Sequence, residues 1–188
     1  VGMNREDFKI TLTPDVEART LTISDNGVGM TAEELEQNLG TIAKSGSKLF
    51  KDSLEDNDSD AVDIIGQFGV GFYSAFMVAD RVVVTSRAYG EDTANVWESD
   101  GADGYTIQPC EKENVGTDIT LYIKPDDDGE DYGQYLDRWH LDMLVRKYSN
   151  YIRWPIIMEM EKSEQVEIDG KTETVTRLEP ETLNSMVP

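Results

Sequence analysis

Alternating apolar and polar side chains mark the first two strands of this chain. In residues 8–13, Phe, Ile and Leu alternate with Lys and Thr, the two-residue period of a strand with one face in water. Pro14 and Asp15 interrupt the alternation, and residues 21–23 resume it. The pattern therefore predicts an antiparallel hairpin with its loop around residues 15–19.

Helical signals follow this hairpin. Thr31 and Glu34 have the spacing of a capping box, in which each side chain satisfies a free backbone N–H at the helix start. We expect this helix to run to about Leu39 and to end at Gly40. Residues 72–78 are mostly apolar and predict a second, buried helix.

The rest of the pattern alternates between strands and one longer helix. Four strands rich in Val, Ile, Thr and aromatic residues are predicted at about 81–88, 95–99, 105–110 and 117–124. A helix is predicted over about 132–153, with apolar residues at near-helical spacing: Leu136, Trp139, Met143, Tyr148 and Ile152. Residues 156–160 alternate again and predict an edge strand.

These elements define an α+β fold, a two-layer sandwich in which a mostly antiparallel sheet of about six strands is faced by helices on one side. From residue 161 the chain is polar and loses its period, so residues 161–188 are interpreted as a linker or tail. Residues 41–65 are polar, with an acidic run at 55–60. A segment of this length inside a compact domain indicates a functional lid or disorder.

Composition narrows the possible partners. The chain has 188 residues, 17 Lys+Arg and 38 Asp+Glu, for a net charge of −21. So negative a field disfavours binding to nucleic acid or anionic lipid. No apolar stretch approaches the roughly 20 residues needed to cross a bilayer. The single cysteine, Cys110, excludes an intrachain disulfide and suits a reducing compartment such as the cytoplasm.

Two glycine-rich motifs carry the candidate chemistry. Residues 25–29 read Asp-x-Gly-x-Gly directly after a predicted strand. Glycines allow the backbone to approach a ligand, and Asp25 offers a carboxylate acceptor. Residues 66–71 read Gly-x-x-Gly-x-Gly and open a predicted helix. Its free N–H groups and positive end form a cradle for an anion.

The spacing of these glycines excludes two common nucleotide motifs. It differs from the dinucleotide fingerprint G-x-G-x-x-G, and no Lys-Ser/Thr pair follows as in a Walker loop. Tight turns alone would also explain each motif taken singly. Together, an acceptor carboxylate, an anion cradle and an intervening loop predict a nucleotide pocket of another design. His140 has no nucleophile motif beside it, so a triad hydrolase is excluded.

Three segments in order also carry a family resemblance. They are Asp-Asn-Gly-Val-Gly-Met at 25–30, Asn-Leu-Gly-Thr-Ile-Ala-Lys-Ser-Gly at 38–46 and Ile-Gly-Gln-Phe-Gly-Val-Gly-Phe-Tyr-Ser at 65–74. They resemble the N-terminal ATPase domain of the ninety-kilodalton heat-shock chaperones, most of all its bacterial branch. That family shares its superfamily with gyrase, histidine kinases and mismatch-repair ATPases. The resemblance runs from about residue 8 to residues 183–188, which resemble the entry to a middle domain.

The resemblance implies a Bergerat-type ATP-binding fold, N-terminally truncated, over residues 1–160, with the lid at about 41–65. Residues 161–188 would then be a linker and the start of the middle domain. The implied cofactors are ATP and Mg²⁺. The implied function is an ATP-dependent molecular chaperone of the stress response, in which ATP binding and hydrolysis close a dimeric clamp on unfolded or partly folded client proteins.

The resemblance also assigns roles to individual residues. Asp25 would accept a hydrogen bond from the adenine amine, with Gly29 and Thr117 completing that polar cluster, and Met30 would pack on the base. Toward the ribose and phosphates it implies Asn38, Lys44, Ser45, Gly46 and the segment Gln67, Phe68, Gly69, Val70, Gly71 and Phe72, which supplies backbone amides.

Simpler structural explanations stay open for several of these residues. Asp25 would also serve as a turn or cap residue, and Met30 as a core filler. Lys44 would also fit a solvated loop, and Thr117 a strand chosen for its propensity alone.

Three function classes therefore compete. The leading one is the ATP-driven chaperone, with client proteins as partners, a homodimer in the full-length parent, and no nucleic acid or membrane partner. The alternative is a non-catalytic protein-interaction module of the same fold. A histidine-kinase or topoisomerase domain is disfavoured by residues 66–74 and by the acidic charge.

The chain departs from the family pattern ahead of Asp25. The family carries a helix there with a Glu-x-x-x-Asn signature, whose Glu activates water and whose Asn holds Mg²⁺. Only the hairpin strands of residues 8–24 precede Asp25. The Glu-x-x-x-Asn spacing does occur at residues 34–38 and 91–95, but both segments follow Asp25, and the second lies in a predicted strand-and-turn region. We therefore assign no catalytic residue and no metal ligand. The polypeptide is expected to bind ATP weakly or not at all, to lack hydrolysis, and to expose an apolar patch that favours association.

Overall fold

The computed structural model describes residues 3–40, 72 and 74–187. The predicted lid and the second glycine motif lie outside these residues. Within them, strands occupy β1 (Ile10–Asp15), β2 (Thr20–Asp25), β3 (Ala79–Arg87), β4 (Ala94–Ser99), β5 (Thr106–Cys110), β6 (Gly116–Ile123), β7 (Ile156–Ile168) and β8 (Lys171–Thr182). The helices are η1 (Arg5–Asp7), α1 (Ala32–Leu35), η2 (Glu36–Gly40, a π-helix), α5 (Ala75–Val78), η3 (Tyr132–Leu136) and α6 (Arg138–Tyr148).

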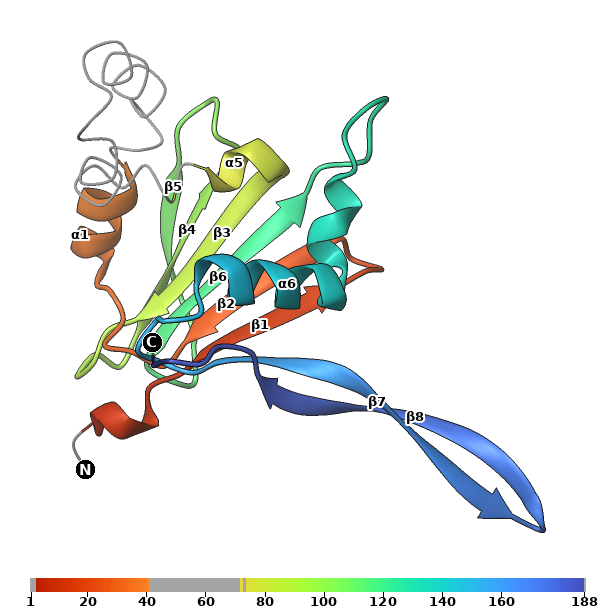
Figure 1. Ribbon diagram of the computed structural model, residues 1–188. Helices are drawn as coiled ribbons and strands as arrows, with labels where there is room; N and C mark the ends of the chain where they lie inside the picture. Colours follow the sequence, from red (N-terminus) through yellow and green to blue (C-terminus); the bar gives the residue numbers. More distant parts are fainter. Residues whose placement is uncertain (1–2, 41–71, 73, 188) are drawn as a thin grey trace.

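All eight of these strands join one sheet in the order β5-β4-β3-β6-β2-β1-β7-β8 (Figure 1). Every neighbouring pair is antiparallel except β1 and β7, which run parallel. The predicted α+β class with a mostly antiparallel sheet is thus confirmed. The edge strand predicted over residues 156–160 is present as β7 and runs on to Ile168, and β8 is a further strand that was not predicted.

One face of the sheet holds the core. Strand register places Leu121 of β6 opposite Leu21 of β2 and Val82 of β3, so these side chains share a face. The side chains that bury there from strands are Leu12, Leu21, Val82, Val84, Trp97, Leu121, Ile123 and Met158, and those from helices are Leu35, Leu39, Leu136, Leu141 and Val145. The opposite face is polar, as the Thr22–Thr120 hydroxyl contact of 3.3 Å illustrates.

The helix predicted over 132–153 is broken at Asp137. A 3-10 turn, η3, precedes this residue, and its carboxylate then accepts a hydrogen bond from Trp139 N at 2.9 Å to cap α6. The buried residues of α6 are Leu141 and Val145, whereas Trp139 is 62% and Met143 49% exposed. Of the predicted apolar stripe only Leu136 is buried, and within α6 the stripe was wrong, because Leu141 and Val145 face the core in place of Trp139 and Met143.

Two further predictions were wrong near the N-terminal half. β1 continues through Pro14 instead of ending there, because β7 pairs with β1 only as far as Leu12. Beyond that point a proline removes no ladder hydrogen bond on the β7 side. The buried helix expected over 72–78 is the four-residue α5, in which no residue is buried.

The irregular tail expected beyond residue 161 is also wrong. β7 runs to Ile168 and pairs along its length with β8 across a two-residue Asp169-Gly170 loop, in which both residues have positive φ (52° and 77°). Asp-Gly between alternating segments is a strong hairpin signal. The chain then returns to the sheet, where buried Asn184 accepts a hydrogen bond from Ile156 N at 2.8 Å.

Candidate functional site

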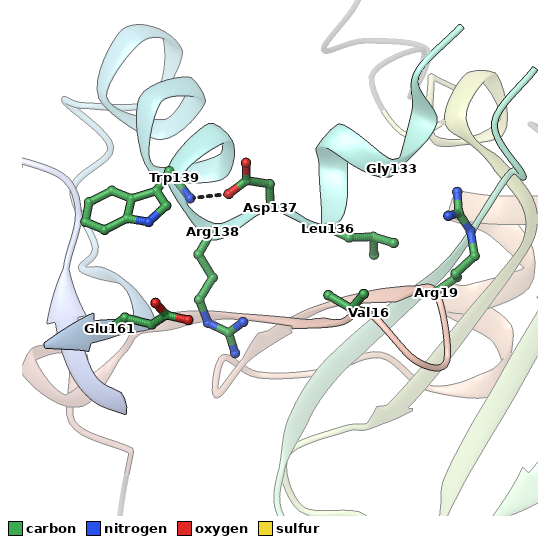
Figure 2. A pocket seen from close by; sticks show the side chains of 8 residues that line it. All are labelled: Val16, Arg19, Gly133, Leu136, Asp137, Arg138, Trp139 and Glu161. Atoms are coloured by element: carbon green, nitrogen blue, oxygen red, sulfur yellow. Dashed lines mark hydrogen bonds between the residues drawn. The ribbon is translucent and has the colours of Figure 1, made fainter. Parts of the chain in front are cut away.

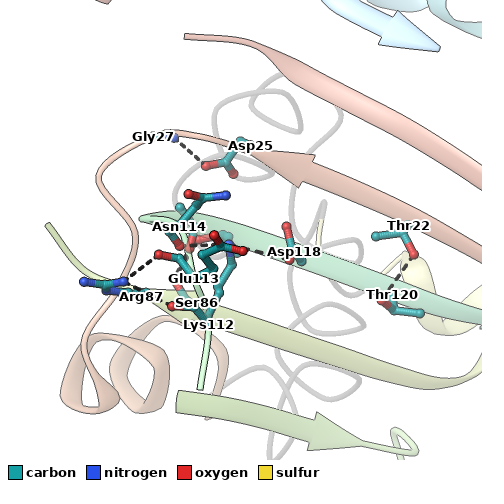
Figure 3. Close-up of polar contacts among 12 residues, drawn as sticks. Thr22, Asp25, Gly27, Ser86, Arg87, Lys112, Glu113, Asn114, Asp118 and Thr120 are labelled. Carbon is teal, nitrogen blue, oxygen red and sulfur yellow. Dashed lines mark hydrogen bonds and ion pairs between the residues drawn. The ribbon is translucent and has the colours of Figure 1, made fainter. Parts of the chain in front are cut away.

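Three neighbouring strands bring the candidate residues to one end of the sheet. Asp25 closes β2 and lies opposite Thr117 of β6, and Thr117 lies opposite Ser86 of β3. Residues opposite one another in an antiparallel pair project from the same face. Asp25, Thr117 and Ser86 therefore share the core-side face, and Figure 3 shows Asp25 at the end of its strand with Ser86 across the sheet.

A buried pair of hydroxyl groups ties this end together. Ser86 Oγ and Thr117 Oγ1 lie 2.8 Å apart, and the two residues are 0% and 5% exposed. Ser86 Oγ also accepts a hydrogen bond from Met30 N at 2.8 Å and donates to Gly116 O at 3.3 Å. The loop after β2 is thereby fastened to β3 and β6.

The sequence alone did not indicate a role for Ser86. It follows Val82 and Val84 at the buried positions of β3, so a hydroxyl there replaces an expected aliphatic side chain. A serine at a buried position of the strand was the only sequence signal for this role, and a single serine in a strand matches no motif.

Asp25 presents an available acceptor. Its Oδ1 accepts a hydrogen bond from Gly27 N at 3.0 Å, which orients the carboxylate at the strand end. The residue is exposed, and within the described residues Oδ2 has no hydrogen-bond partner. The second oxygen can therefore accept a hydrogen bond from a ligand.

Gly29 lies where a side chain cannot be accommodated. Its φ is +67°, and a Cβ built there would stand 1.9 Å from Arg87 O. The adjoining Val28 O accepts a hydrogen bond from Tyr89 N at 2.8 Å. This loop thus packs backbone against backbone on the end of β3, an approach that only glycine permits at position 29.

Met30 and Asn38 lie beside this cluster. Asn38 Nδ2 is 3.8 Å from Met30 Sδ, and Met30 is half-buried against the core. Of the implied ligand residues, the structure therefore brings together Asp25, Gly29, Met30, Asn38 and Thr117. Lys44, Ser45, Gly46, Gln67, Phe68, Gly69, Val70 and Gly71 lie outside the described residues.

Phe72 is described, and its ring belongs to the core. The ring meets Trp97 edge-on at 5.7 Å and Phe76 at 6.5 Å between centroids. Any contact of Phe72 with a ligand would therefore involve its backbone, as the family resemblance implies.

Tyr105 fixes the helical segment that carries Asn38. Its hydroxyl donates a hydrogen bond to Glu36 Oε1 at 3.1 Å, and its ring stacks on Trp97 at 6.0 Å. Burial raises the pKa of the Tyr105 phenol, and the Glu36 carboxylate raises it further. A Cβ on Gly40 would lie 2.7 Å from the same hydroxyl, so this ring needs a glycine at the end of η2.

The described residues fit the base of a nucleotide better than they fit its metal. A planar ligand with a hydrogen-bond donor suits the Asp25 oxygen that no described residue occupies, the buried hydroxyl pair and the bare backbone at Gly29. Among residues 3–40, 72 and 74–187, no group of three or more His, Cys, Asp or Glu side chains could hold a metal ion. In the same part of the chain, no helix is long and apolar enough to cross a membrane.

Two hollows lie away from this site. One, of about 380 Å³, lies between the β1–β2 turn and the start of α6, and Figure 2 shows Arg19 and Arg138 at its margins. The other, of about 670 Å³, lies between α5 and η3, with Ile23, Ile119 and Leu121 among its lining residues. The first contains none of the predicted ligand residues, and the second contains only Phe72.

Comparison with known proteins agrees with this geometry. Residues 4–118 match a family model described as histidine kinase-, DNA gyrase B- and HSP90-like ATPase. The chain belongs to this family of ATPases, and its eight-stranded α+β sheet is consistent with the Bergerat fold.

Its relatives include chaperone protein HtpG from several bacteria. The chain is 54% identical to that of Natranaerobius thermophilus over 188 residues, which is 100% of this chain and 30% of the relative. It is 53% identical to that of Halalkalibacterium halodurans over 189 residues, again 100% and 30%. It is 54% identical to that of Bacillus velezensis over 186 residues, which is 98% of this chain and 29% of the relative. The resemblance to the heat-shock chaperone domain is confirmed, and the chain spans about 30% of the length of these relatives.

Proposed function

We propose that this chain is the ATP-binding part of an ATP-dependent chaperone. ATP binding and hydrolysis would close a dimeric clamp on unfolded or partly folded client proteins. The observation that carries the proposal is the Asp25 carboxylate oxygen that has no hydrogen-bond partner among the described residues, beside the buried Ser86–Thr117 hydroxyl pair. The HSP90-like ATPase family match and the chaperone names of the relatives support it.

Asp25 selects the base in this proposal. A carboxylate accepts hydrogen bonds only, so it pairs with the exocyclic amine of adenine and opposes the carbonyl that guanine presents at the same position. A guanine in the same position would therefore leave the Asp25 carboxylate facing a second acceptor, with no hydrogen bond between them. Met30, held by its N–H to Ser86 Oγ at 2.8 Å, is placed to pack on the base.

The phosphates and Mg²⁺ are assigned more coarsely. Bound ATP supplies the phosphoanhydride whose cleavage drives the clamp, and Mg²⁺ neutralises its phosphate charge. We propose Lys44, Ser45, Gly46 and the backbone of Gln67, Phe68, Gly69, Val70, Gly71 and Phe72 as phosphate contacts, with Asn38 toward the ribose. No general base and no metal ligand is assigned.

The domain division, the partners and the location belong to the same proposal. We divide the chain at residue 160, because Met160 is buried and residues 161–178 are all exposed, before Leu183 and Asn184 pack on the sheet again. Residues 1–160 would form the ATP-binding domain with its lid at about 41–65, and residues 161–188 would lead into the next domain. Client proteins are the proposed partners, with a homodimer in the longer protein, and the proposed location is the cytoplasm.

A polypeptide of this 188-residue sequence alone is expected to bind ATP weakly, with a Kd of about 1 mM or more, and to release no phosphate. The reason is that residues 3–25 form only η1, β1 and β2, so nothing there supplies a Glu-x-x-x-Asn helix. Calorimetric titration with ATP and Mg²⁺ and a phosphate-release assay test this expectation. Micromolar affinity or measurable release would overturn it.

The Asp25→Asn variant of a longer protein carrying this chain tests the function. Asn keeps the size of the side chain but removes the charge, so ATP binding and client refolding should fall together. Asp15→Asn is the matched control, because Asp15 also ends a strand and accepts a backbone hydrogen bond, from Ala18 N at 3.0 Å. Refolding that survives the loss of ATP binding would instead favour a non-catalytic interaction module.

A further inference from the structure

None of the elements that the structure describes packs on the outer half of the β7–β8 hairpin. β1 pairs with β7 only from Ile156 to Met158, and from residue 161 to 178 every residue is exposed. Figure 1 shows this ribbon projecting away from the sheet. Its exposed apolar side chains are Val166, Ile168, Val175 and Leu178, 38–47% accessible. An isolated two-stranded ribbon is marginally stable in water, so this one gains from a partner.

The loop geometry identifies the backbone groups that are available on β8. A two-residue loop makes the closing pair, Ile168 and Lys171, a hydrogen-bonded pair. Odd-numbered residues of β8 therefore bond to β7, and the N–H and C=O groups of even-numbered residues point outward. Pro180 is even-numbered, so its missing N–H falls on the outer edge, where a strand tolerates proline.

The charges along one face of β8 complement themselves. Reading the odd-numbered residues gives Lys171, Glu173, Val175, Arg177 and Glu179. When two copies of this strand are laid antiparallel about Val175, Lys171 faces the partner's Glu179. Glu173 then faces the partner's Arg177. In this register every charged side chain of the five therefore lies opposite a side chain of the opposite charge.

Other registers lose this complementarity. A slip of two residues in one direction places Glu173 opposite the partner's Glu179, and a slip in the other places Lys171 opposite the partner's Arg177. Like charges directly opposite one another destabilise a strand pair. Charged residues on an edge strand usually prevent pairing. Here their alternating signs oppose the slipped registers and favour the one centred on Val175.

We propose that β8 pairs antiparallel with β8 of a second copy of this chain, continuing the sheet across a twofold axis at Val175. Thr172 would form a hydrogen-bonded pair with the partner's Leu178, and Thr174 with the partner's Thr176, each pair occurring twice by symmetry. The paired segment ends at Glu179, directly before Pro180. The backbone ladder supplies most of the affinity, because exposed ion pairs contribute little, and the charges set the register.

Existing contacts of the ribbon are compatible with this pairing. Arg177 now bonds to Glu179 at 2.6 Å and to Glu164 at 3.2 Å, and it is 58% exposed. Exchanging Glu179 for the partner's Glu173 keeps the Glu164 contact and frees Glu179 for the partner's Lys171. Within the described residues, neither Lys171 nor Glu173 has a side-chain ion pair to lose. The pairing is independent of nucleotide binding.

Sedimentation of the 188-residue chain over a concentration series tests the proposal. The native chain should dimerise, and Arg177→Glu or Glu173→Arg should each weaken the dimer by about tenfold or more. The double variant Glu173→Arg/Arg177→Glu restores opposite charges and should restore the dimer. Glu167→Arg is the control, because it makes the same charge change on β7, away from the paired edge. A monomeric native chain, or a dimer insensitive to the single reversals, would overturn the proposal.

Cysteine cross-linking tests the register directly. Val175 would form a non-hydrogen-bonded pair with the partner's Val175, with Cα atoms about 4.5 Å apart, a spacing that a disulfide spans. In a Cys110→Ser background, Val175→Cys should give a covalent dimer under mild oxidation. Val166→Cys, of similar exposure on β7, should not. Equal cross-linking of the two variants would refute the register, whether or not the charge variants fold fully.

Discussion

Gly29 and Gly90 both have positive φ, of +67° and +85°, but only Gly29 has a neighbour within reach of a side chain. Gly90→Ala therefore meets only the backbone cost of the left-handed region, about 1–2 kcal/mol. Gly29→Ala adds a collision with Arg87 O, 1.9 Å from the new Cβ, and should cost about 3 kcal/mol or more. Chemical unfolding of the two variants measures the difference. Equal losses would show that the loop can move off β3.

Asp126 gives the clearest pH dependence at the residue scale. Its carboxylate accepts from Gly133 N at 2.8 Å and contacts Arg19 at 3.3 Å. The Gly133 N–H, helped by the Arg19 guanidinium and partly opposed by desolvation, lowers the pKa of this carboxyl below its ordinary value of 3.8. A lowered pKa means that the unfolded chain binds the proton more tightly than the folded chain does. Asp126 therefore contributes to the stability of the fold above about pH 4, and this stabilisation is lost at lower pH.

Asp126→Asn should therefore be less stable than the native chain at pH 7, and the difference should shrink as the pH falls through the folded-state pKa. Urea unfolding at several pH values from 7 to 3 measures this difference. Because both proteins carry the same remaining charges, the general effect of acid cancels. A difference that stays constant with pH would contradict the assigned cause.

Single residues were predicted where a motif surrounds them. Asp25 and Gly29 were identifiable because glycines punctuate the chain directly after a strand. Ser86 was not, because its role depends on Thr117, 31 positions away, which only strand pairing brings to 2.8 Å. The buried hydroxyl pair is a tertiary feature that local sequence does not encode.

At the scale of elements, α6 shows how a helix face was assigned wrongly. The apolar residues Trp139 and Met143 have helical spacing, yet they are 62% and 49% exposed, while Leu141 is 5% exposed. Leu141→Ala should cost about 2–5 kcal/mol because it opens a cavity. Met143→Ala should change the stability by about 0.5 kcal/mol or less, as surface substitutions usually do. Thermal unfolding that ranks the two variants in the opposite order would contradict the described packing.

The β7–β8 hairpin was missed for a different reason. Its residues alternate weakly because both faces lie in water, so the usual contrast between a buried and an exposed face is absent. The Asp169-Gly170 loop was the surviving signal, and it fixes the register of the whole ribbon.

For the whole molecule, the layered α+β class followed from the order of strands and helices, but the full extent of the sheet did not. Strands β1 to β6 carry apolar residues for one core and were identifiable from them. The parallel pairing of β1 with β7 joins residues 10–12 to 156–158, a contact between distant segments that no local pattern specifies. That pairing places the C-terminal part of the chain on the sheet that carries the site.

In the proposed site, Asp25 anchors an adenine nucleotide at the end of β2. Titration of the isotope-labelled chain with ATP and Mg²⁺, followed by the backbone amide signals, tests this claim even when binding is weak. We expect saturable shifts that include residues 25–30 and 116–118 at the base, with a Kd of about 1 mM or more. These shifts should be lost in Asp25→Asn and kept in Asp15→Asn. Shifts centred elsewhere, or unchanged in Asp25→Asn, would contradict it.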